Sequence, residues 1–162
     1  MRIDTFLEQS PMFAVNRAAR RFETLAGRVL ADCNLGFLEA LALAALFFEA
    51  PRQVKPSELA ATFATTRGSV SHCVSSLEAK GLVQRSIDAE DARVFLLALK
   101  PQGRRFALRA IAALDKLQKA FEDEMGKAAL GEMIRGLRRL DSLFLGQTGQ
   151  RMGRATDSGP RI

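Results

Sequence analysis

The sequence contains no tryptophan and no tyrosine, and it has only two cysteines and one histidine in 162 residues. Phenylalanine, present in 11 copies, must therefore fill the aromatic positions. Cys33 and Cys73 are too few for a disulfide framework, which fits the reducing environment of the cytoplasm. The single histidine, His72, has no second ligand placed near it, so a metal site or a histidine-based catalytic site is disfavoured.

The sequence also lacks an apolar run long enough to cross a membrane. Its strongest run, residues 35–48, is short and is interrupted by Glu39, so it predicts a buried core helix. No basic segment followed by a long apolar stretch stands at the N-terminus, and we therefore expect no signal peptide. These absences favour a cytoplasmic protein without a membrane partner, and the length suits one domain with a helical extension.

Acidic residues are in the minority. The chain has 24 Lys and Arg against 18 Asp and Glu, a net charge of +6 and a pI of about 10.0. Nine basic and five acidic residues fall within 51–105, so most of the excess lies in the middle third. A basic balance favours an anionic partner, either nucleic acid or a membrane surface, and charge alone does not choose between them.

Spacing, capping residues and helix breakers predict a mainly α-helical chain with one β-hairpin. Ser10 before Pro11 predicts a helix start, because a hydroxyl caps free N–H groups and proline suits the first turn. Gly81 predicts a helix end. The predicted helices cover residues 11–33, 36–49, 56–63, 66–80, 101–126 and 128–145, and the predicted strands cover residues 82–87 and 94–99.

The helix over 66–80 has two contrasting faces. Val70, Val74 and Leu77 form an apolar stripe with Cys73 beside it. The opposite face is small or polar and contains no acid: Arg67, Ser69, Ser71, His72, Ser75 and Ser76. Two helices followed by a two-stranded hairpin make a winged helix-turn-helix, and a face of this kind can enter a DNA major groove without repelling phosphates. Arg67 and His72 have the reach to contact base edges or phosphates.

The predicted hairpin tip, "IDAEDARVF" at residues 87–95, concentrates acids in a basic protein. A calcium loop needs more oxygen ligands and a glycine at the turn, and Arg93 would oppose a cation. A catalytic carboxylate pair would need a nucleophile or a pocket nearby, and none is evident. Two interpretations stay open: a solvated turn, or Asp88 and Asp91 holding the Arg93 guanidinium in position for DNA. Glu90 has no assigned role.

The stretch "ELAATFATTRGSVSHCVSSLEAKGLVQRSIDAEDARVFLLALKPQG" resembles the core of the multiple antibiotic resistance regulator (MarR) family. The resemblance is close over about residues 54–105 and looser in the flanking helices. The matching positions are Leu59-Ala60, Ser69-Val70-Ser71, "LEAKGLV" at residues 77–83, Arg85, Asp88, Asp91, Arg93, Leu99 and Gly103. No single piece is specific, but all occur in order and at the right spacing.

The resemblance implies a homodimeric transcriptional regulator that binds a pseudo-palindromic site on double-stranded DNA, and it implies neither an enzyme nor a cofactor. The fourth helix would read the major groove, the wing arginine would enter the minor groove, and Arg85 would contact a phosphate. The implied DNA-binding residues are Thr66, Arg67, Ser69, Ser71, His72, Ser75, Arg85 and Arg93. Asp88 and Asp91 would support the wing.

The predicted fold class is mainly α with a small β-hairpin wing. It comprises an N-terminal dimerisation helix (1–34), a winged helix-turn-helix domain (35–105), C-terminal dimerisation helices (106–146) and a disordered tail (147–162). Dimerisation is expected because the apolar stripes of the flanking helices are too long for one small winged helix to cover. The tail is expected to be disordered because it is rich in Gly, Ser, Thr and Arg.

Regulation by a small molecule or an oxidant is a further expectation, with a repressor as the expected type of regulator. Family members bind aromatic acids beside the dimer helices, and an effector pocket bordered by Phe13, Arg17, Phe22, Phe47 and Phe48 would suit one. Core packing is the more frequent explanation for such residues.

The two cysteines differ in their neighbours. Cys33, beside Asp32, could sense oxidants although a nearby acid disfavours the thiolate, and Cys73 reads as core filler. The alternative function is a winged-helix module that binds protein and not DNA.

Overall fold

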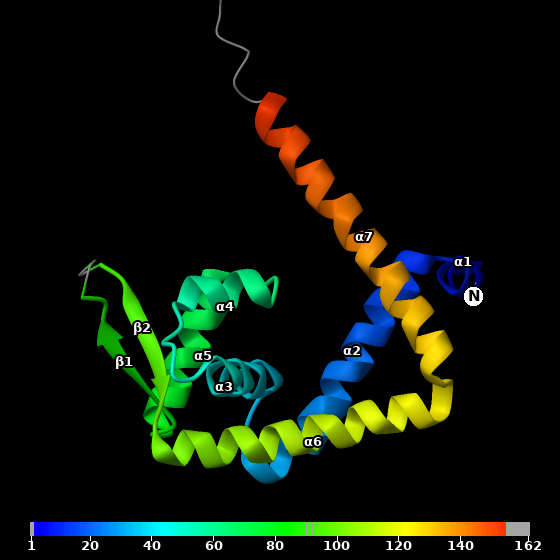
Figure 1. Cartoon of the computed structure of the whole chain (residues 1–162). Helices are drawn as coiled ribbons and strands as arrows, with labels where there is room; N and C mark the ends of the chain where they lie inside the picture. Colours follow the sequence, from blue (N-terminus) through cyan, green and yellow to red (C-terminus); the bar gives the residue numbers. More distant parts are fainter. Residues whose placement is uncertain (1, 90, 92, 155–162) are drawn as a thin grey trace, which may run out of the picture. The chain divides into compact units, whose positions relative to one another are not determined.

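The computed structural model describes residues 2–89, 91 and 93–154 (Figure 1). Two compact units have their boundary between Leu117 and Gln118. The elements are α1 (Arg2–Glu8), α2 (Pro11–Leu30), the 3-10 turn η1 (Ala31–Cys33), α3 (Phe37–Glu49), α4 (Pro56–Thr62), α5 (Arg67–Ala79), β1 (Val83–Ile87), β2 (Phe95–Leu99), α6 (Pro101–Met125) and α7 (Lys127–Arg154). This order confirms the predicted helices and hairpin, and it adds α1, which the sequence pattern did not predict.

Local capping explains where the helices begin and end. The Ser10 hydroxyl accepts the N–H three residues on (3.3 Å), and the Thr66 hydroxyl accepts the Ser69 N–H (3.0 Å). Gly81 ends the turn after α5 with φ +70°, and Gly126 separates α6 from α7 with φ +76°. Both glycines adopt left-handed backbone that other residues rarely take.

The core of the first unit surrounds α3. Leu43 is fully buried, and the stripe predicted on α5 is buried as expected, with Leu77 fully covered. The core cluster also includes Leu30 at the end of α2 and Ala107 on α6. The apolar run at residues 35–48 is therefore a core helix. Among the described residues no single helix has the length and apolarity to cross a membrane, and one pair, 11–33 with 37–49, meets those criteria only jointly and is bent by 67°.

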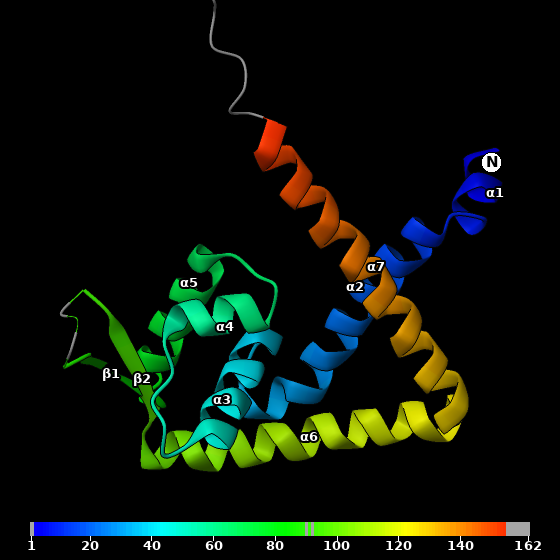
Figure 2. The ribbon, with the colours of Figure 1, turned by 45° about the horizontal axis from the view of Figure 1, so that its top comes forward.

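The two strands form an antiparallel hairpin that projects beyond the helices of the first unit (Figures 1 and 2). Val54, before α4, adds a short bridge to Leu97: each N–H donates to the other's carbonyl oxygen, at 3.2 and 2.9 Å. Leu97 is fully buried, whereas Phe95 on the same face is 46% exposed. The helices thus cover only the base of the hairpin. Residues 83–99, the two strands with their loop, are called the wing below.

α7 is longer than the composition predicts. It runs to Arg154, through eight residues (147–154) of the stretch expected to be disordered, while 155–162 lie outside the described residues. The expectation of a disordered tail stays a prediction. Extending an existing helix needs no new nucleus, so the propagation cost of a few polar residues and glycines is small beside the cost of starting a helix.

Candidate nucleic-acid interface

α5 presents the small, polar face that its sequence predicts. Thr66, Arg67, Ser69, Ser71, His72 and Ser75 are all exposed. The Thr66 and Ser69 hydroxyl oxygens lie 2.8 Å apart in a hydrogen bond at the first turn. No acidic side chain lies among these exposed positions, and the helix N-terminus has N–H groups that favour a phosphate. α5 is called the reading helix below.

Arg85 has a different environment from the one expected. Its guanidinium forms an ion pair with Glu78 on the reading helix (Nε to Oε2, 2.8 Å) and donates to the Ser75 hydroxyl (3.1 Å). These two contacts tie β1 to the reading helix in the unbound protein, and the phosphate contact of Arg85 stays a prediction. Ser75 is held by the same bond.

The wing acids act on the backbone. Asp91 accepts the backbone N–H of Arg93 at its carboxylate (3.0 Å), and its carbonyl accepts the N–H of Val94 (2.9 Å). The carboxylate of Asp88 lies 3.6 Å from the Lys55 ammonium. The orientation of the Arg93 guanidinium by these acids stays a prediction. Glu90 lies outside the described residues.

A cleft of about 350 Å³ joins the wing to the start of α4 and the start of the reading helix. We call it the wing cleft. Its lining residues are Lys55, Pro56, Ser57, Arg67, Arg93, Val94 and Phe95. Three cationic side chains from three separate elements thus border one concave surface with an apolar floor. Such an arrangement attracts a phosphate backbone.

Arg67 and Arg93 were predicted from the sequence, but Lys55 and Ser57 were not. The sequence signal for them was weak, because a lysine and a serine around a proline read simply as a helix start. Their place beside the wing depends on the bridge between Val54 and Leu97, a contact between residues distant in the chain.

An ion network holds the start of α4 in place. Arg52 pairs with Glu49 (2.8 Å) and Glu58 (2.9 Å), and Glu58 also accepts the backbone N–H of Lys55 (2.7 Å). That backbone bond is the main cause of the lowered pKa of Glu58. Partial burial acts in the opposite direction and raises the pKa, whereas the bond and charge of Arg52 lower it further. The network fixes the segment that carries Lys55 and Ser57 to the cleft.

The five residues predicted for an effector pocket lie in separate contacts. Arg17 stacks over Phe13 (5.6 Å to the ring centre), and Phe47 packs edge-on against Phe48 (5.7 Å). Phe22 makes an edge-on contact with Phe37 of α3 (5.2 Å). A second arginine, Arg104, lies over Phe47 (4.9 Å) and was not predicted. Phe48 is 71% exposed. The pairing of arginine with aromatic rings recurs, but these contacts do not join the five into one site.

Both cysteines are buried. Burial, and then the charge of Glu39, raise the pKa of the Cys73 thiol to about 11. A thiol with so high a pKa is a poor nucleophile at neutral pH. Cys73 thus fits the predicted packing role. Among the described residues no group of three or more His, Cys, Asp or Glu side chains could hold a metal ion.

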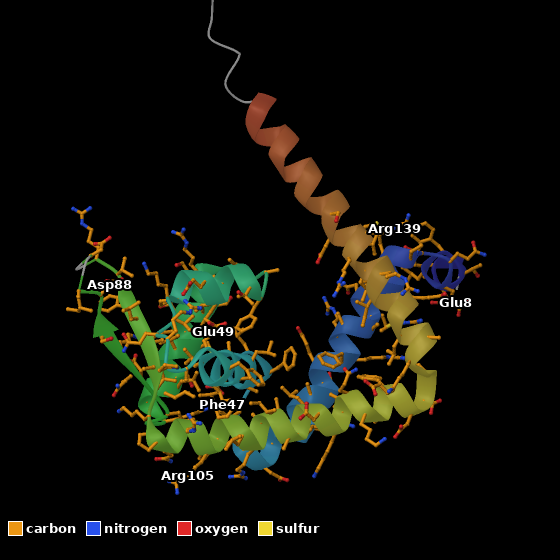
Figure 3. The ribbon with its side chains drawn as sticks, viewed as in Figure 1. Glu8, Phe47, Glu49, Asp88, Arg105 and Arg139 are labelled. Carbon is orange, nitrogen blue, oxygen red and sulfur yellow. The ribbon has the colours of Figure 1, made fainter. Side chains whose placement is uncertain are left out.

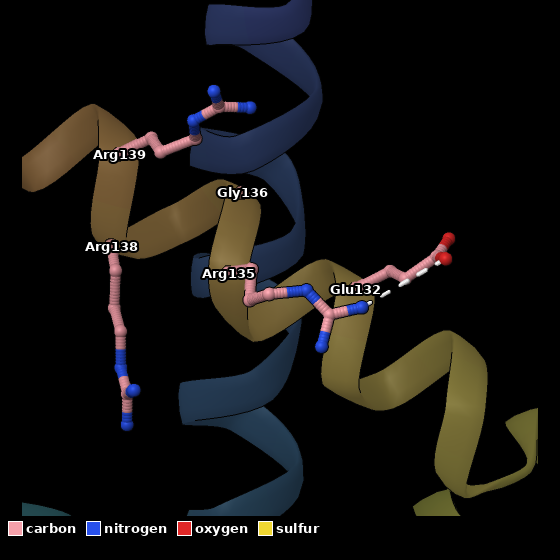
Figure 4. A pocket seen from close by; sticks show the side chains of 5 residues that line it. All are labelled: Glu132, Arg135, Gly136, Arg138 and Arg139. Carbon is pink, nitrogen blue, oxygen red and sulfur yellow. Dashed lines mark ion pairs between the residues drawn. The ribbon is translucent and has the colours of Figure 1, made fainter.

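A second hollow, of about 480 Å³, lies on α7 beside Arg135, Arg138 and Arg139 (Figure 4). Arg135 points toward Glu132, 3.8 Å away, while Arg138 and Arg139 point in opposite directions. Because these guanidinium groups diverge, the hollow lacks the converging donors that would hold a small anion. The wing cleft, with cations from three elements, is the stronger candidate for a phosphate.

Known proteins share this fold. Residues 49–95 match the model of the MarR family. YdcH, a helix-turn-helix transcriptional regulator of Bacillus subtilis strain 168, is 28% identical over 114 residues, which cover 69% of this chain and 78% of that protein. The S. aureus MepR–DNA complex matches with a TM-score of 0.76 at 17% identity, over 82% of this chain and 97% of that one.

CouR of Rhodococcus jostii RHA1, in its structure with p-coumaroyl-CoA, matches with a TM-score of 0.71 at 23% identity, over 83% of this chain and 93% of that one. The family match and the structural matches confirm the predicted resemblance and the winged-helix fold.

Proposed function

We propose that this chain, which belongs to the MarR family of transcriptional regulators, binds a pseudo-palindromic operator as a homodimer through the reading helix and the wing. Members of the family are DNA-binding proteins and not enzymes. The observation that carries the proposal is the wing cleft, because Lys55, Arg67 and Arg93 meet there beside an acid-free helix face. A phosphate backbone between the wing and the reading helix would contact all three cations.

Separate roles follow for the residues of this surface. The reading helix places Arg67, Ser69, Ser71 and His72 toward base edges in the major groove. Arg93, whose side chain is exposed, enters the minor groove. Arg85 acts indirectly, since Ser75 and Glu78 already engage it.

Dimerisation is supported by large apolar side chains that each unit leaves exposed. In the first unit Phe6 is 67% and Met12 78% exposed. In the second, Met133, Ile134 and Leu137 on α7 are each more than 40% exposed. Apolar surface gathered in this way on helices is typical of an interface. We therefore assign the apolar faces of the helices within residues 1–34 and 106–146 to the dimer interface.

The regulator is proposed to be a cytoplasmic repressor that a small aromatic ligand releases from DNA. Two features support an aromatic ligand: arginines lie over the rings of Phe13 and Phe47, and CouR, a protein of the same fold, holds p-coumaroyl-CoA. Oxidant sensing is less favoured, because both cysteines are buried.

The test begins with selection of genomic fragments by the purified protein, followed by binding to the selected duplex at moderate salt. Arg93→Ala should weaken binding clearly while the fold and the dimer stay intact. Arg67→Ala should cost about 1–3 kcal/mol on the selected duplex if it reads a base, and an equal loss on random DNA would make it a phosphate contact.

Arg105→Ala is the matched control, since Arg105 lies on α6 far from Asp88 at the wing (Figure 3). If the wild-type protein selects no fragment, the alternative of a protein-binding winged helix is favoured. Unchanged affinity of Arg93→Ala would refute the wing assignment alone.

A further inference from the structure

Lys80, the residue after the reading helix, directs its ammonium group into a junction of helices. The Nζ atom donates to both carboxylate oxygens of Glu39, at 2.7 and 2.9 Å, and to the carbonyl oxygen of Asn34, at 2.8 Å. An ammonium group has three protons, and three acceptors surround it. Glu39 is only 9% exposed although it is a carboxylate on the most apolar helix.

Glu39 makes further bonds around this junction. Its carboxylate accepts the backbone N–H of Gly36, at 2.8 Å, and it hydrogen-bonds to Ser76 on the reading helix. Burial raises the pKa of Glu39, but the bonds from Lys80, Ser76 and Gly36 together lower it below its ordinary value. The carboxylate is therefore held in its charged form.

The junction links elements with different proposed tasks. Asn34 is the left-handed residue (φ 51°) that closes the turn after α2. Glu39 lies in the first turn of α3, and Lys80 caps the C-terminal end of the reading helix. A single ammonium group thus joins the end of α2, assigned to the dimer interface, to the helix assigned to DNA.

We propose that Lys80 and Glu39 are positioning residues that fix the reading helix relative to α2, and so determine which half-site spacing the dimer accepts. The inference rests on the proposed function. In a dimeric helix-turn-helix protein, the two reading helices must match half-sites about one helical turn apart, roughly 34 Å. That distance depends on how rigidly each reading helix is attached to the helices that form the dimer.

The alternative is that the pair contributes only to stability. The test must therefore separate positioning from unfolding. Removing Lys80 alone would leave a buried, unpaired carboxylate, which is strongly destabilising. The double variant Glu39→Gln with Lys80→Met removes both charges, and the glutamine oxygen can still accept the Gly36 N–H. A neutral replacement of a buried pair need not destabilise the fold.

The experiment measures fluorescence anisotropy of labelled duplexes with the full-length protein. The duplexes are the site selected by the wild-type protein, the same site with one base pair inserted between its half-sites, and an isolated half-site. One base pair displaces a half-site by about 3.4 Å along the axis. The matched control is Lys119→Met with Asp123→Asn, an exposed pair (3.0 Å) on the polar side of α6.

The double variant should lose about tenfold in affinity for the selected site and discriminate less against the inserted base pair. Its affinity for the isolated half-site should stay within about twofold of the wild type, because that contact needs no fixed spacing. The exposed-pair control should behave like the wild type. A single Lys80→Arg variant, in which Glu39 is intact, should keep most of the spacing preference of the wild type, because arginine keeps a charged donor toward Glu39.

Two results would overturn the inference while leaving the proposed function intact. One is a double variant with wild-type affinity and spacing preference. The other is an equal loss on all three duplexes, which matches a reduced amount of folded protein. Failure of the wild type to bind any duplex would instead overturn the proposed function, and this inference with it.

Discussion

A Gly103→Ala substitution should destabilise the protein, although alanine is the better helix former by about 1 kcal/mol. Gly103 is buried in the first turn of α6, where the helix backbone approaches the start of β1. A Cβ at this position would lie 1.9 Å from the carbonyl oxygen of Leu82 and 2.8 Å from its carbonyl carbon. Real Cβ atoms essentially never come closer than 3.0 Å, so the backbone must move by more than 1 Å.

The size of the effect follows from what that movement would break. The Leu82 carbonyl oxygen accepts the N–H of Lys100 (3.0 Å), and Leu82 itself is 1% exposed. Loss of a buried backbone hydrogen bond costs about 1–3 kcal/mol, and forcing extra volume into a packed core costs about 1–3 kcal/mol. After subtraction of the gain in helix propensity, the net loss of stability is about 1–5 kcal/mol.

Urea unfolding followed by far-ultraviolet circular dichroism measures this loss, because the protein has no tryptophan or tyrosine to report by fluorescence. The protein concentration must be fixed, since the proposed dimer would gain stability with concentration. In a thermal melt followed by the same circular dichroism signal, Tm should fall by roughly 2–20 °C. Gly27→Ala is the control. Apart from its chain neighbours and the nearby backbone of α2 itself, no heavy atom lies within 4 Å of the point that its new Cβ would occupy, so this variant should gain up to about 1 kcal/mol. A Gly103→Ala protein as stable as the wild type would refute the close approach.

Two further predictions concern titratable groups. The pKa of Cys73 is raised from 9.0 to about 11, so its thiolate fraction at neutral pH is about a hundredfold below that of an unperturbed thiol. In a Cys33→Ser protein, where Cys73 is the remaining cysteine, maleimide should therefore label the native protein far more slowly than the unfolded one. Rapid native labelling would contradict the burial. The folded pKa of Glu39 lies below 4.5, so its contribution to stability is complete above 4.5 and is lost as the pH falls through the folded value. The difference in unfolding free energy between the wild type and Glu39→Gln should therefore shrink on acidification, and a difference independent of pH would contradict the assignment.

Helix boundaries were predictable because their signals are local. Ser10 and Thr66 each cap a helix by bonding an N–H three residues away, and Gly81 supplies the left-handed backbone at its own position. A short sequence window contains everything that such a feature requires. The buried stripe of the reading helix was equally predictable from the sequence, since the spacing of its apolar residues follows the period of the helix.

Features that depend on distant contacts were not predictable. Lys55 reaches the wing cleft only because Val54 pairs with Leu97, more than forty residues away. Glu39 looked like an interruption of an apolar run, and its partner Lys80 follows 41 residues later. The length of α7 was underestimated for a related reason: composition describes each residue alone, whereas a helix already formed lowers the cost of adding the next.

The acids of the wing show that adjacent residues in the sequence do not by themselves determine which atoms bond. The sequence placed Asp91 beside Arg93, and the expected bond was carboxylate to guanidinium. In the structure the same carboxylate accepts the backbone N–H of Arg93 instead. This difference matters for function, because an ion pair would have to break before the guanidinium could meet a phosphate. The bond from Asp91 to the backbone fixes the turn and leaves the positive charge of Arg93 available for DNA. Asp91, an acid at the wing tip of a basic protein, therefore supports the binding of an anionic partner and does not compete with that partner for the guanidinium.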